Sequence, residues 1–374
     1  MPWKENTTMS QRQEFVQEAL KGTANIRALC REYGITARTG YKWIKRYQEQ
    51  GEMGLYDRSR RPKHSPQKSG FLIEEAVLRV RRTHPAWGGR KIRWKLAQEG
   101  VQPTPSASTI TAILHRHDQI QPEESDKHRA SQRFEMEQPN QLWQMDFKGY
   151  FEMANGALCH PLTVIDDHSR YLVGLKACHA ERSKTVRSHL EGIFECYGLP
   201  ERMLMDNGSV WQGYHTGLTF WLVRLGIQVV HGRPYHPQTQ GKDERLHRTL
   251  KDELLRDQQF FDLKDCQSKF DTWREIYNYQ RPHQALNMQP PAAHYEPSLR
   301  LFTGQFPIIK YEPGDILRTT DIYGRLIFQT RRFRVGKAFC LSQVAIRPTE
   351  LDGVFNVFFF KQRIAQINLL IDNP

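Results

Sequence analysis

Apolar residues near the start of the chain recur every three to four positions, the spacing of one helix face. This spacing predicts three helices, at about residues 10–20, 24–33 and 37–49. Their expected inward-facing side chains are Phe15, Val16, Ala19, Ile26, Leu29, Cys30, Trp43, Ile44 and Tyr47. Gly34 can end the second helix in a left-handed conformation, and Thr36 can cap the third. Two helices joined by a tight turn, the second of them basic, are typical of a helix-turn-helix unit at 8–50.

The third of these helices carries polar and basic groups on its outer side. They are Arg38, Thr39, Lys42 and Lys45. We expect all four to contact DNA, and we expect Arg38, Thr39 and Lys42 to read bases. The alternative is an ordinary three-helix packing unit with a solvated outer face. Gly40 weakens the helix prediction, because glycine inside a helix costs about 1 kcal/mol relative to alanine.

A basic linker and a second helical unit follow. Residues 51–69 are rich in Gly, Pro, Ser and basic side chains, and we expect Arg60 and Arg61 in this linker to follow a phosphate backbone. Helical spacing returns at 70–118, and the predicted helices are at about 74–82, 88–96 and 106–115, the last capped by Ser106. Arg90 and Lys91 make the middle helix basic. We interpret this unit as DNA-binding, with a plain helical spacer as the alternative.

After a polar linker at 119–139, the apolar pattern changes to that of strands. Strands are predicted at 142–151, 161–166, 170–175, 202–205 and 228–230, and helices at about 181–196, 212–224, 240–255 and 263–279. This order indicates a mixed sheet with helices on both faces over 140–302. Beyond residue 303 the chain is strand-like and rich in Gly-containing turns, which favours a small β-barrel at 303–374. The predicted fold class is therefore multidomain.

Charge narrows the classes of partner. The 374 residues carry a net charge of +13, of which residues 1–133 hold +11, residues 134–302 hold −2 and residues 303–374 hold +4. Basic ends favour a polyanion such as DNA, because its binding releases condensed counterions; a solubilising surface charge is the alternative. No apolar run approaches the ~20 residues of a membrane helix, and we expect no secretory leader. The six scattered cysteines form no C-x-x-C pair, so no zinc framework is expected.

Three carboxylates stand in apolar or turn-forming settings. Asp146 lies within a predicted strand, Asp206 follows the apolar stretch ERMLM, and Glu244 opens a predicted helix. Two strand ends and a helix start can bring these groups to one site for hard cations such as Mg²⁺, two of which can serve phosphodiester chemistry. Asp166 and Asp167 are competitors that we interpret as turn-forming residues.

The helix that begins near Glu244 also carries cations. Arg248 and Lys251 follow Glu244 at i+4 and i+7, so all three share one face and would place DNA phosphates beside the metal. Lys242 joins this DNA-binding set. The alternative for this face is a pair of ordinary helix-surface salt links, worth only ~0.3–0.5 kcal/mol each.

Five motifs taken together resemble the integrase-core transposases of bacterial insertion sequences. They are WQMDF at 143–147, VIDDHSRY at 164–171, MDNGS at 205–209, HPQTQGKDERLHRTLK at 236–251 and YNYQRPHQAL at 277–286. The resemblance implies an RNase H-like core in which Asp146, Asp206 and Glu244 bind two Mg²⁺ or Mn²⁺ ions, and in which Lys251 contacts element-end DNA. The interval 207–243 is slightly longer than the commonest integrase interval, which leaves Asp243 as a rival for the role of Glu244.

The expected protein is a DNA transposase of the bacterial cytoplasm, associated with the nucleoid and bound to no membrane. It would grip terminal inverted repeats of double-stranded DNA, hydrolyse a phosphodiester to free a 3′-OH and join that end to target DNA, working as at least a dimer. One alternative is a DNA-binding regulator with a catalytically idle RNase H-like scaffold. The other is a simple Mg²⁺-dependent nuclease.

Overall fold

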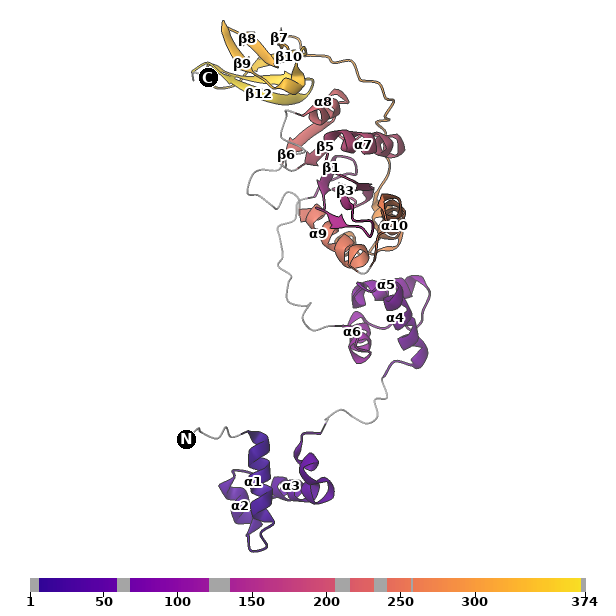
Figure 1. Ribbon diagram of the computed structural model, residues 1–374, viewed down its shortest axis with the longest axis vertical. Coiled ribbons are helices and arrows are strands. Elements are labelled where there is room, and N and C mark those ends of the chain that lie inside the picture. The colour runs from indigo at the N-terminus through magenta and orange to yellow at the C-terminus, as the bar shows by residue number, and fades with distance from the viewer. Residues whose placement is uncertain are drawn as a thin grey trace. The chain divides into compact units, whose positions relative to one another are not determined.

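The computed structural model describes residues 7–58, 68–120, 135–205, 216–231, 241–256 and 258–370 (Figure 1). The chain divides into two compact units, Met1–Lys68 and Ser69–Pro374. No helix in the described ranges has the length and apolar character needed to cross a bilayer.

The first unit is a bundle of three helices, as its periodicity predicts. The helices are α1 (Thr8–Ala19), α2 (Ile26–Glu32) and α3 (Ala37–Gln50), followed by a 3-10 turn, η1 (Gly51–Leu55). Their core consists of Phe15, Val16, Cys30, Trp43 and Leu55. Gly34 has a φ of +63° at the turn before α3, and the Thr36 hydroxyl accepts a hydrogen bond from the Thr39 N–H at 3.3 Å. Both predicted helix-boundary signals are therefore confirmed.

Gly40 is explained by the packing of α3 against its neighbours. A Cβ at this position would lie 2.4 Å from Cys30 Sγ and 2.8 Å from Phe15 Cζ. The loss of helix propensity at Gly40 is thus the consequence of a close approach between α3 and the rest of the core.

The second helical unit also has its own core. Its helices are α4 (Phe71–Thr83), α5 (Gly89–Gln98) and α6 (Ala107–Arg116). The buried side chains are Val77, Val80, Trp87, Ile92, Leu96, Ile110, Ile113 and Leu114. The Ser106 hydroxyl caps α6 by accepting the Thr109 N–H at 3.1 Å, as predicted.

A mixed sheet forms the centre of the larger unit. Its strands are β1 (Leu142–Phe147), β2 (Phe151–Glu152), β3 (Leu158–Asp166), β4 (Leu172–Cys178), β5 (Arg202–Met205) and β6 (Gln228–His231). They lie in the order β2-β3-β1-β5-β6, with β4 beside β3. β1 is antiparallel to β3 and parallel to β5, and β5 is parallel to β6. The single strand predicted at 142–151 is wrong, because the chain turns at Gly149, where φ is +84°, and separates β1 from β2.

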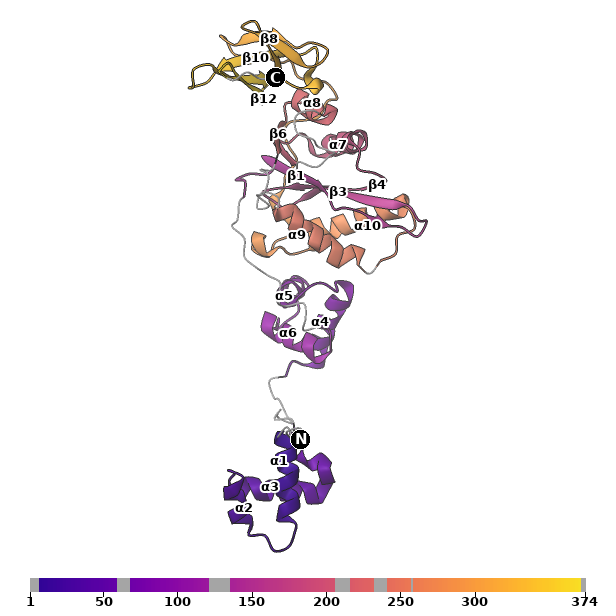
Figure 2. The ribbon, with the colours of Figure 1, turned by 60° about the vertical axis from the view of Figure 1, so that its left-hand side comes forward.

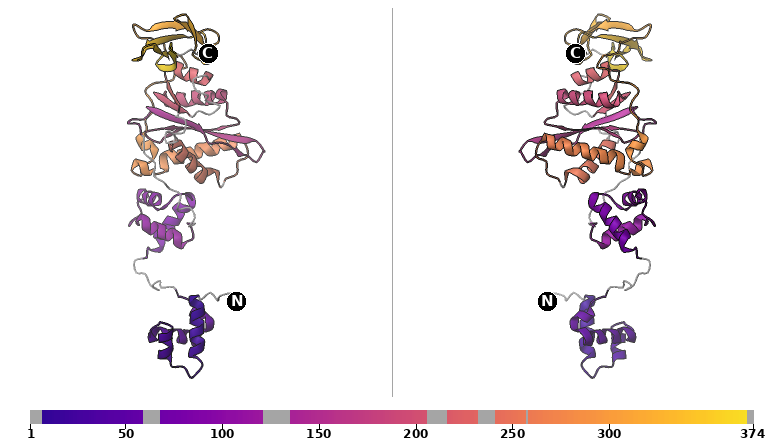
Figure 3. Two further views of the ribbon diagram at one scale, coloured as in Figure 1. Left: turned by 90° about the vertical axis from the view of Figure 1, so that its left-hand side faces the viewer. Right: turned by 90° about the vertical axis from the view of Figure 1, so that its right-hand side faces the viewer.

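Helices cover both faces of this sheet (Figures 2 and 3). α7 (Ser183–Tyr197) and α8 (Gly217–Arg224) lie on one face, and α9 (Gly241–Leu250) and α10 (Leu263–Glu275) lie on the other. Each of the latter pair continues into a π-helical turn, η5 (Lys251–Leu255) after α9 and η6 (Ile276–Gln280) after α10. Short 3-10 turns, η7 (Gln284–Leu286) and η8 (Pro291–His294), follow.

The C-terminal region is an open antiparallel sheet and not the closed barrel that the sequence suggests. Its strands are β7 (Ile316–Thr319), β10 (Gln343–Pro348), β11 (Val354–Phe359) and β12 (Gln362–Asn368), in the order β12-β11-β10-β7. A hairpin of β8 (Arg325–Phe328) and β9 (Arg331–Arg334) and a 3-10 turn, η9 (Lys337–Phe339), complete it.

The C-terminal sheet does not need to close into a barrel, because it packs against the β8–β9 hairpin and α8. Phe355 of β11 contacts Phe328 of the hairpin at 4.8 Å between ring centroids. Phe220 of α8 stacks on Phe359 at 5.2 Å, and the Gln362 side-chain oxygen accepts the Val229 N–H of β6 at 3.0 Å. The hairpin and α8 thus bury apolar surface that a closed barrel would bury within itself.

Candidate active site

Asp146 lies near the end of β1, beside the middle of β3. Its backbone pairs with Thr163, whose hydroxyl donates to the Asp146 carbonyl at 3.0 Å. One carboxylate oxygen of Asp146 accepts the Phe147 N–H at 2.8 Å. The side chain is 24% exposed. The carboxylate predicted within an apolar strand therefore lies near the end of a central strand, where it is partly exposed to solvent.

A second carboxylate, Asp243, comes to the same place from α9. It shares the buried face of that helix with Leu246 and Leu250 and is 1% exposed. Neither of its oxygens has a hydrogen-bond partner among the described residues. Burial raises the pKa of Asp243 well above its usual value, and the nearby carboxylates of Asp146 and Asp167 raise it further.

His247, one turn after Asp243, lies between the helix and the strand. Its Nε2 is 2.9 Å from the Thr163 hydroxyl, and its Nδ1 is 4.0 Å from an Asp146 oxygen. Burial, followed by the charge of Lys148, lowers the pKa of His247 to about 4. The ring is therefore neutral at pH 7 and supplies no positive charge to either carboxylate.

The structure describes two of the three predicted catalytic residues, Asp146 and Glu244. Glu244 is exposed, one position around α9 from the buried face, and Asp206 lies outside the described residues. β5 ends at Met205, and its parallel register pairs Leu204 with Gln144, two residues before Asp146. The end of β5 is therefore level with the part of β1 that carries Asp146. Among the described residues, no group of three or more His, Cys, Asp or Glu side chains could hold a metal ion.

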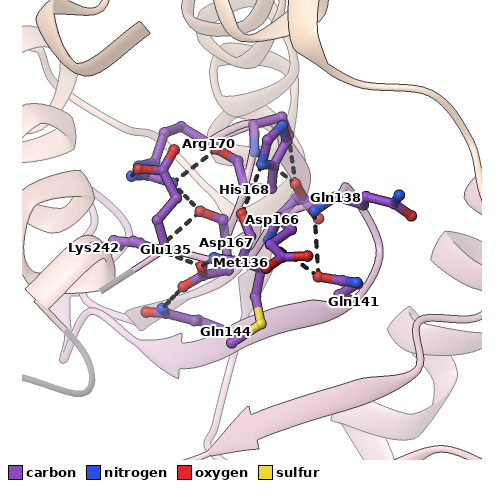
Figure 4. A network of polar contacts seen from close by, with 12 residues as sticks. Glu135, Met136, Gln138, Gln141, Gln144, Asp166, Asp167, His168, Arg170 and Lys242 are labelled. Atoms are coloured by element: carbon purple, nitrogen blue, oxygen red, sulfur yellow. Dashed lines mark hydrogen bonds and ion pairs between the residues drawn. The ribbon is translucent and has the colours of Figure 1, made fainter. Parts of the chain in front are cut away.

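The competing pair, Asp166 and Asp167, is fully engaged in a buried network at the end of β3 (Figure 4). Asp166 accepts the Asn140 N–H at 2.7 Å and both the N–H and the hydroxyl of Ser169 at 2.8 and 2.7 Å. Asp167 accepts the Met136 N–H at 2.8 Å and the Gln144 amide at 2.6 Å. These hydrogen bonds fix the turn after β3, the structural role that the sequence favours.

Lys242 also belongs to that network. Its Nζ lies 2.5 Å from an Asp167 oxygen and 3.0 Å from the Asp167 carbonyl, and the side chain is 14% exposed. Burial is the largest cause that lowers the pKa of Lys242 to about 8. Lys242, which the sequence predicts to contact DNA, is thus already paired with Asp167 inside the protein.

The DNA-binding candidates of the first unit lie along α3. Arg38, Lys42 and Lys45 are exposed, and Thr39 is half-buried beside its capping partner Thr36. Lys42 Nζ lies 4.2 Å from the centroid of the Trp43 ring, and Lys45 pairs with Glu49 at 3.8 Å.

The remaining candidates divide by exposure. Arg90, Arg248 and Lys251 are exposed, whereas Arg60 and Arg61 lie outside the described residues. Lys91 pairs with Glu253 of η5 at 3.5 Å, and Arg281 donates to the same Glu253 oxygen at 2.9 Å. In this arrangement α5 contacts the α/β core through Lys91, a contact that sequence reasoning missed.

Sequence reasoning also left Asp243 only as a rival to Glu244. The signal that distinguishes it is its spacing from Leu246 and Leu250, at i+3 and i+7, which places a carboxylate on the apolar stripe of α9.

Comparisons with known proteins agree with this architecture. Models of the integrase core domain match residues 136–237 and 225–291. A helix-turn-helix domain model matches residues 11–63, a homeodomain-like domain model matches residues 39–114, and the C-terminal domain of IS481 family transposases matches residues 315–373.

Individual relatives are similar over shorter or more divergent stretches. The "Insertion element IS407 uncharacterized 31.7 kDa protein" of Burkholderia multivorans is 27% identical over 161 residues, 41% of this chain and 54% of that protein. The transposase for transposon Tn552 of Staphylococcus aureus is 25% identical over 318 residues, 75% of this chain and 65% of that protein. The HTLV-2 integrase catalytic core domain in complex with magnesium matches 43% of this chain and 99% of its own, with 15% identity and a TM-score of 0.35.

The fold and the domain matches define an integrase core preceded by helix-turn-helix domains. The chain is related to the integrase-like transposases of insertion sequences, as its five motifs indicate. It spans about half the length of the first curated relatives that it matches, 54% and 44%.

Proposed function

We propose that this protein is a DNA transposase. It binds the terminal inverted repeats of its element, hydrolyses a phosphodiester with water to free a 3′-OH, and joins that end to target DNA without a covalent protein intermediate. Its site of action is the bacterial cytoplasm, at the nucleoid.

The observation that carries this proposal is the position of Asp146. Its partly exposed carboxylate lies near the end of a strand of an integrase core, beside a second carboxylate on α9 and level with the end of β5. Asp206 directly follows Met205, the last residue of β5, and Glu244 directly follows Asp243. Asp146, Asp206 and Glu244 are therefore the proposed acidic triad.

The donor set suits a hard divalent cation. Asp243 presents two buried carboxylate oxygens without described partners, and carboxylate oxygens are the ligands that Mg²⁺ and Mn²⁺ take in proteins. The proposed triad would hold two such ions, which supply activation of the attacking oxygen and stabilisation of the leaving oxygen. The exposed cations of the chain would bind the DNA strand and align it beside Asp146.

The exposed cations supply the proposed DNA contacts. Arg38, Lys42 and Lys45 on α3 lie in a unit matched by a helix-turn-helix model, and Arg248 and Lys251 face solvent on the same helix as Glu244. Phosphate contacts would provide most of the affinity, and base contacts from α3 would provide the specificity. Because joining requires two element ends together, the proposed active species on DNA is at least a dimer.

The test is a strand-transfer assay on the full chain. Duplexes with pre-cut terminal repeats from either side of its gene are incubated with target DNA and Mg²⁺, and joined products are measured. Wild-type protein should form joined products, Asp146→Asn should form none, and Asp252→Asn on η5 should behave as wild type.

Other outcomes assign the alternatives. Cleavage of the DNA without joined products would identify a simple nuclease. Specific binding of the repeats with no cleavage or joining, unchanged by Asp146→Asn, would identify a regulator with an idle core.

A further inference from the structure

The buried carboxylate of Asp243 is costly where it lies. It occupies an apolar stripe of α9 with Leu246 and Leu250, and neither of its oxygens has a hydrogen-bond partner among the described residues. His247, one turn further along the same helix, lies 4.0 Å from an Asp146 oxygen. A buried carboxyl group without a partner is costly whether it stays ionised or takes up a proton, so such groups are normally paired or bound to metals. A leucine or valine would fill this position without that cost.

The Thr163 hydroxyl eases the burial of Asp243 by lowering its pKa, whereas the other polar groups nearby are paired elsewhere. Lys242, the preceding residue, directs its ammonium group to Asp167 at 2.5 Å. The His247 ring contacts the Thr163 hydroxyl at 2.9 Å. That hydroxyl donates its hydrogen to the Asp146 carbonyl. No described cation therefore pairs with the Asp243 carboxyl group.

We propose that Asp243 is a cation-binding residue, a fourth acidic group that serves the divalent-metal site together with Asp146. This inference rests on the proposed function, because it assigns a further ligand to the same metal centre. A divalent cation between two carboxylates converts their repulsion into attraction and satisfies oxygens that the protein leaves unpartnered. Glu244, exposed on the adjacent face of α9, then remains open to the DNA side of the site.

The proposal predicts opposite effects of Asp243 on stability and on metal binding. Without metal, the carboxylate weakens the packing of α9, so that replacing it with a neutral side chain should not destabilise the fold. With metal, the same replacement should remove affinity. A residue whose role is only structural would show the reverse pattern, a lower melting temperature in every condition.

The experiment measures Mn²⁺ binding by isothermal titration calorimetry, and melting temperature in EDTA and in Mn²⁺, on the full chain. Asp243→Asn should lower Mn²⁺ affinity by at least about tenfold, the scale of loss seen for groups that tune metal sites. Asp243→Asn and Asp243→Leu should melt no lower than wild type in EDTA and should lose the rise in melting temperature that Mn²⁺ gives wild type. Asp252→Asn, which removes a half-buried acid paired with Arg256 at 3.0 Å, is the matched control and should bind as wild type.

Each contrary outcome has a distinct meaning. Wild-type affinity in Asp243→Asn, with affinity lost in Asp146→Asn, overturns this inference and leaves the proposed function intact. Lower melting temperatures in EDTA for both Asp243 variants make the residue structural and also overturn it. No Mn²⁺ binding by wild type overturns the inference and removes the metal centre of the proposed function.

Discussion

At the scale of single residues, the packing of the first unit depends on a glycine, Gly40. Gly40 allows α3 to approach Cys30 and Phe15 more closely than any Cβ would permit. Helix propensity favours alanine there, whereas packing forbids it, and packing has the larger effect.

Gly40→Ala should therefore lower the free energy of unfolding of the first unit by about 1–3 kcal/mol, the cost of overpacking a core. Chemical denaturation of the full chain, followed by hydrogen exchange of peptides from α1, α2 and α3, measures the change. Adding Cys30→Ala should recover part of the loss, because it removes the Sγ that the new methyl group would meet at 2.4 Å. A stabilised Gly40→Ala variant would contradict this account.

The exposed lysines of α3, Lys42 and Lys45, differ in the side chains that they contact. Lys42 lies over the face of Trp43 at 4.2 Å, while Lys45 is paired with Glu49 at 3.8 Å on the surface. A surface pair of this kind contributes little and is screened by salt.

Lys42→Ala should weaken binding to terminal-repeat DNA by about 1–3 kcal/mol if this side chain reads a base. Titration of labelled duplexes at fixed salt measures the loss, with Lys45→Ala as the neighbouring comparison. An equal loss on repeat and unrelated DNA would make Lys42 a phosphate contact.

At the scale of elements, α9 has two faces with different tasks. Its buried face, with Asp243, Leu246 and Leu250, rests on the sheet, and its exposed face carries Glu244, Arg248 and, at the start of η5, Lys251. Arg248 and Lys251 are exposed, so they are available to a ligand.

Lys251→Glu should abolish joining of element ends while the circular dichroism spectrum stays that of wild type, because the change reverses a charge on an exposed surface. Joining measured in the strand-transfer assay tests this directly. Retained joining would remove Lys251 from the DNA-binding surface.

At the scale of the larger unit, the second helical unit contacts the α/β core through a shared carboxylate. Glu253 of η5 receives Lys91 from α5 and Arg281 from the segment after η6, and its side chain is 9% exposed. The turn between α4 and α5 lines a groove with Leu254, Lys269 and Trp273 of the core. A residue predicted to bind DNA thus serves an internal contact.

This contact should give the protein a measurable pH dependence. Burial, followed by the charge of Arg281, lowers the pKa of Lys91 from 10.5 to about 8. Below pH 8 both folded and unfolded chains hold the proton, and the cost of burying the charge is fully present. Between pH 8 and 10.5 the unfolded chain holds more protons, so Lys91 makes the free energy of unfolding rise with pH.

The melting temperature of wild type minus that of Lys91→Met should therefore increase as pH rises from 7.5 to 10. Differential scanning calorimetry at several pH values measures the difference. A difference that stays constant or falls with pH would show that Lys91 is not buried at this contact.

The sequence by itself determined the elements and most of their order. The spacing of Phe15, Val16 and Trp43 predicted the first three helices, and the alternation after residue 140 predicted a mixed sheet with helices on both faces. These features depend on interactions within a few residues along the chain, which periodicity and capping residues report.

Only the tertiary structure decided how side chains from distant segments share a site. It placed Asp243 beside Asp146, committed Lys242 to Asp167 and Lys91 to Glu253, and left the C-terminal sheet open against α8. Sequence spacing shows which face of its helix an ionisable side chain occupies. The partner of that side chain, however, lies on another helix or strand. Pairing and burial of ionisable groups therefore depend on long-range packing, which local patterns do not encode.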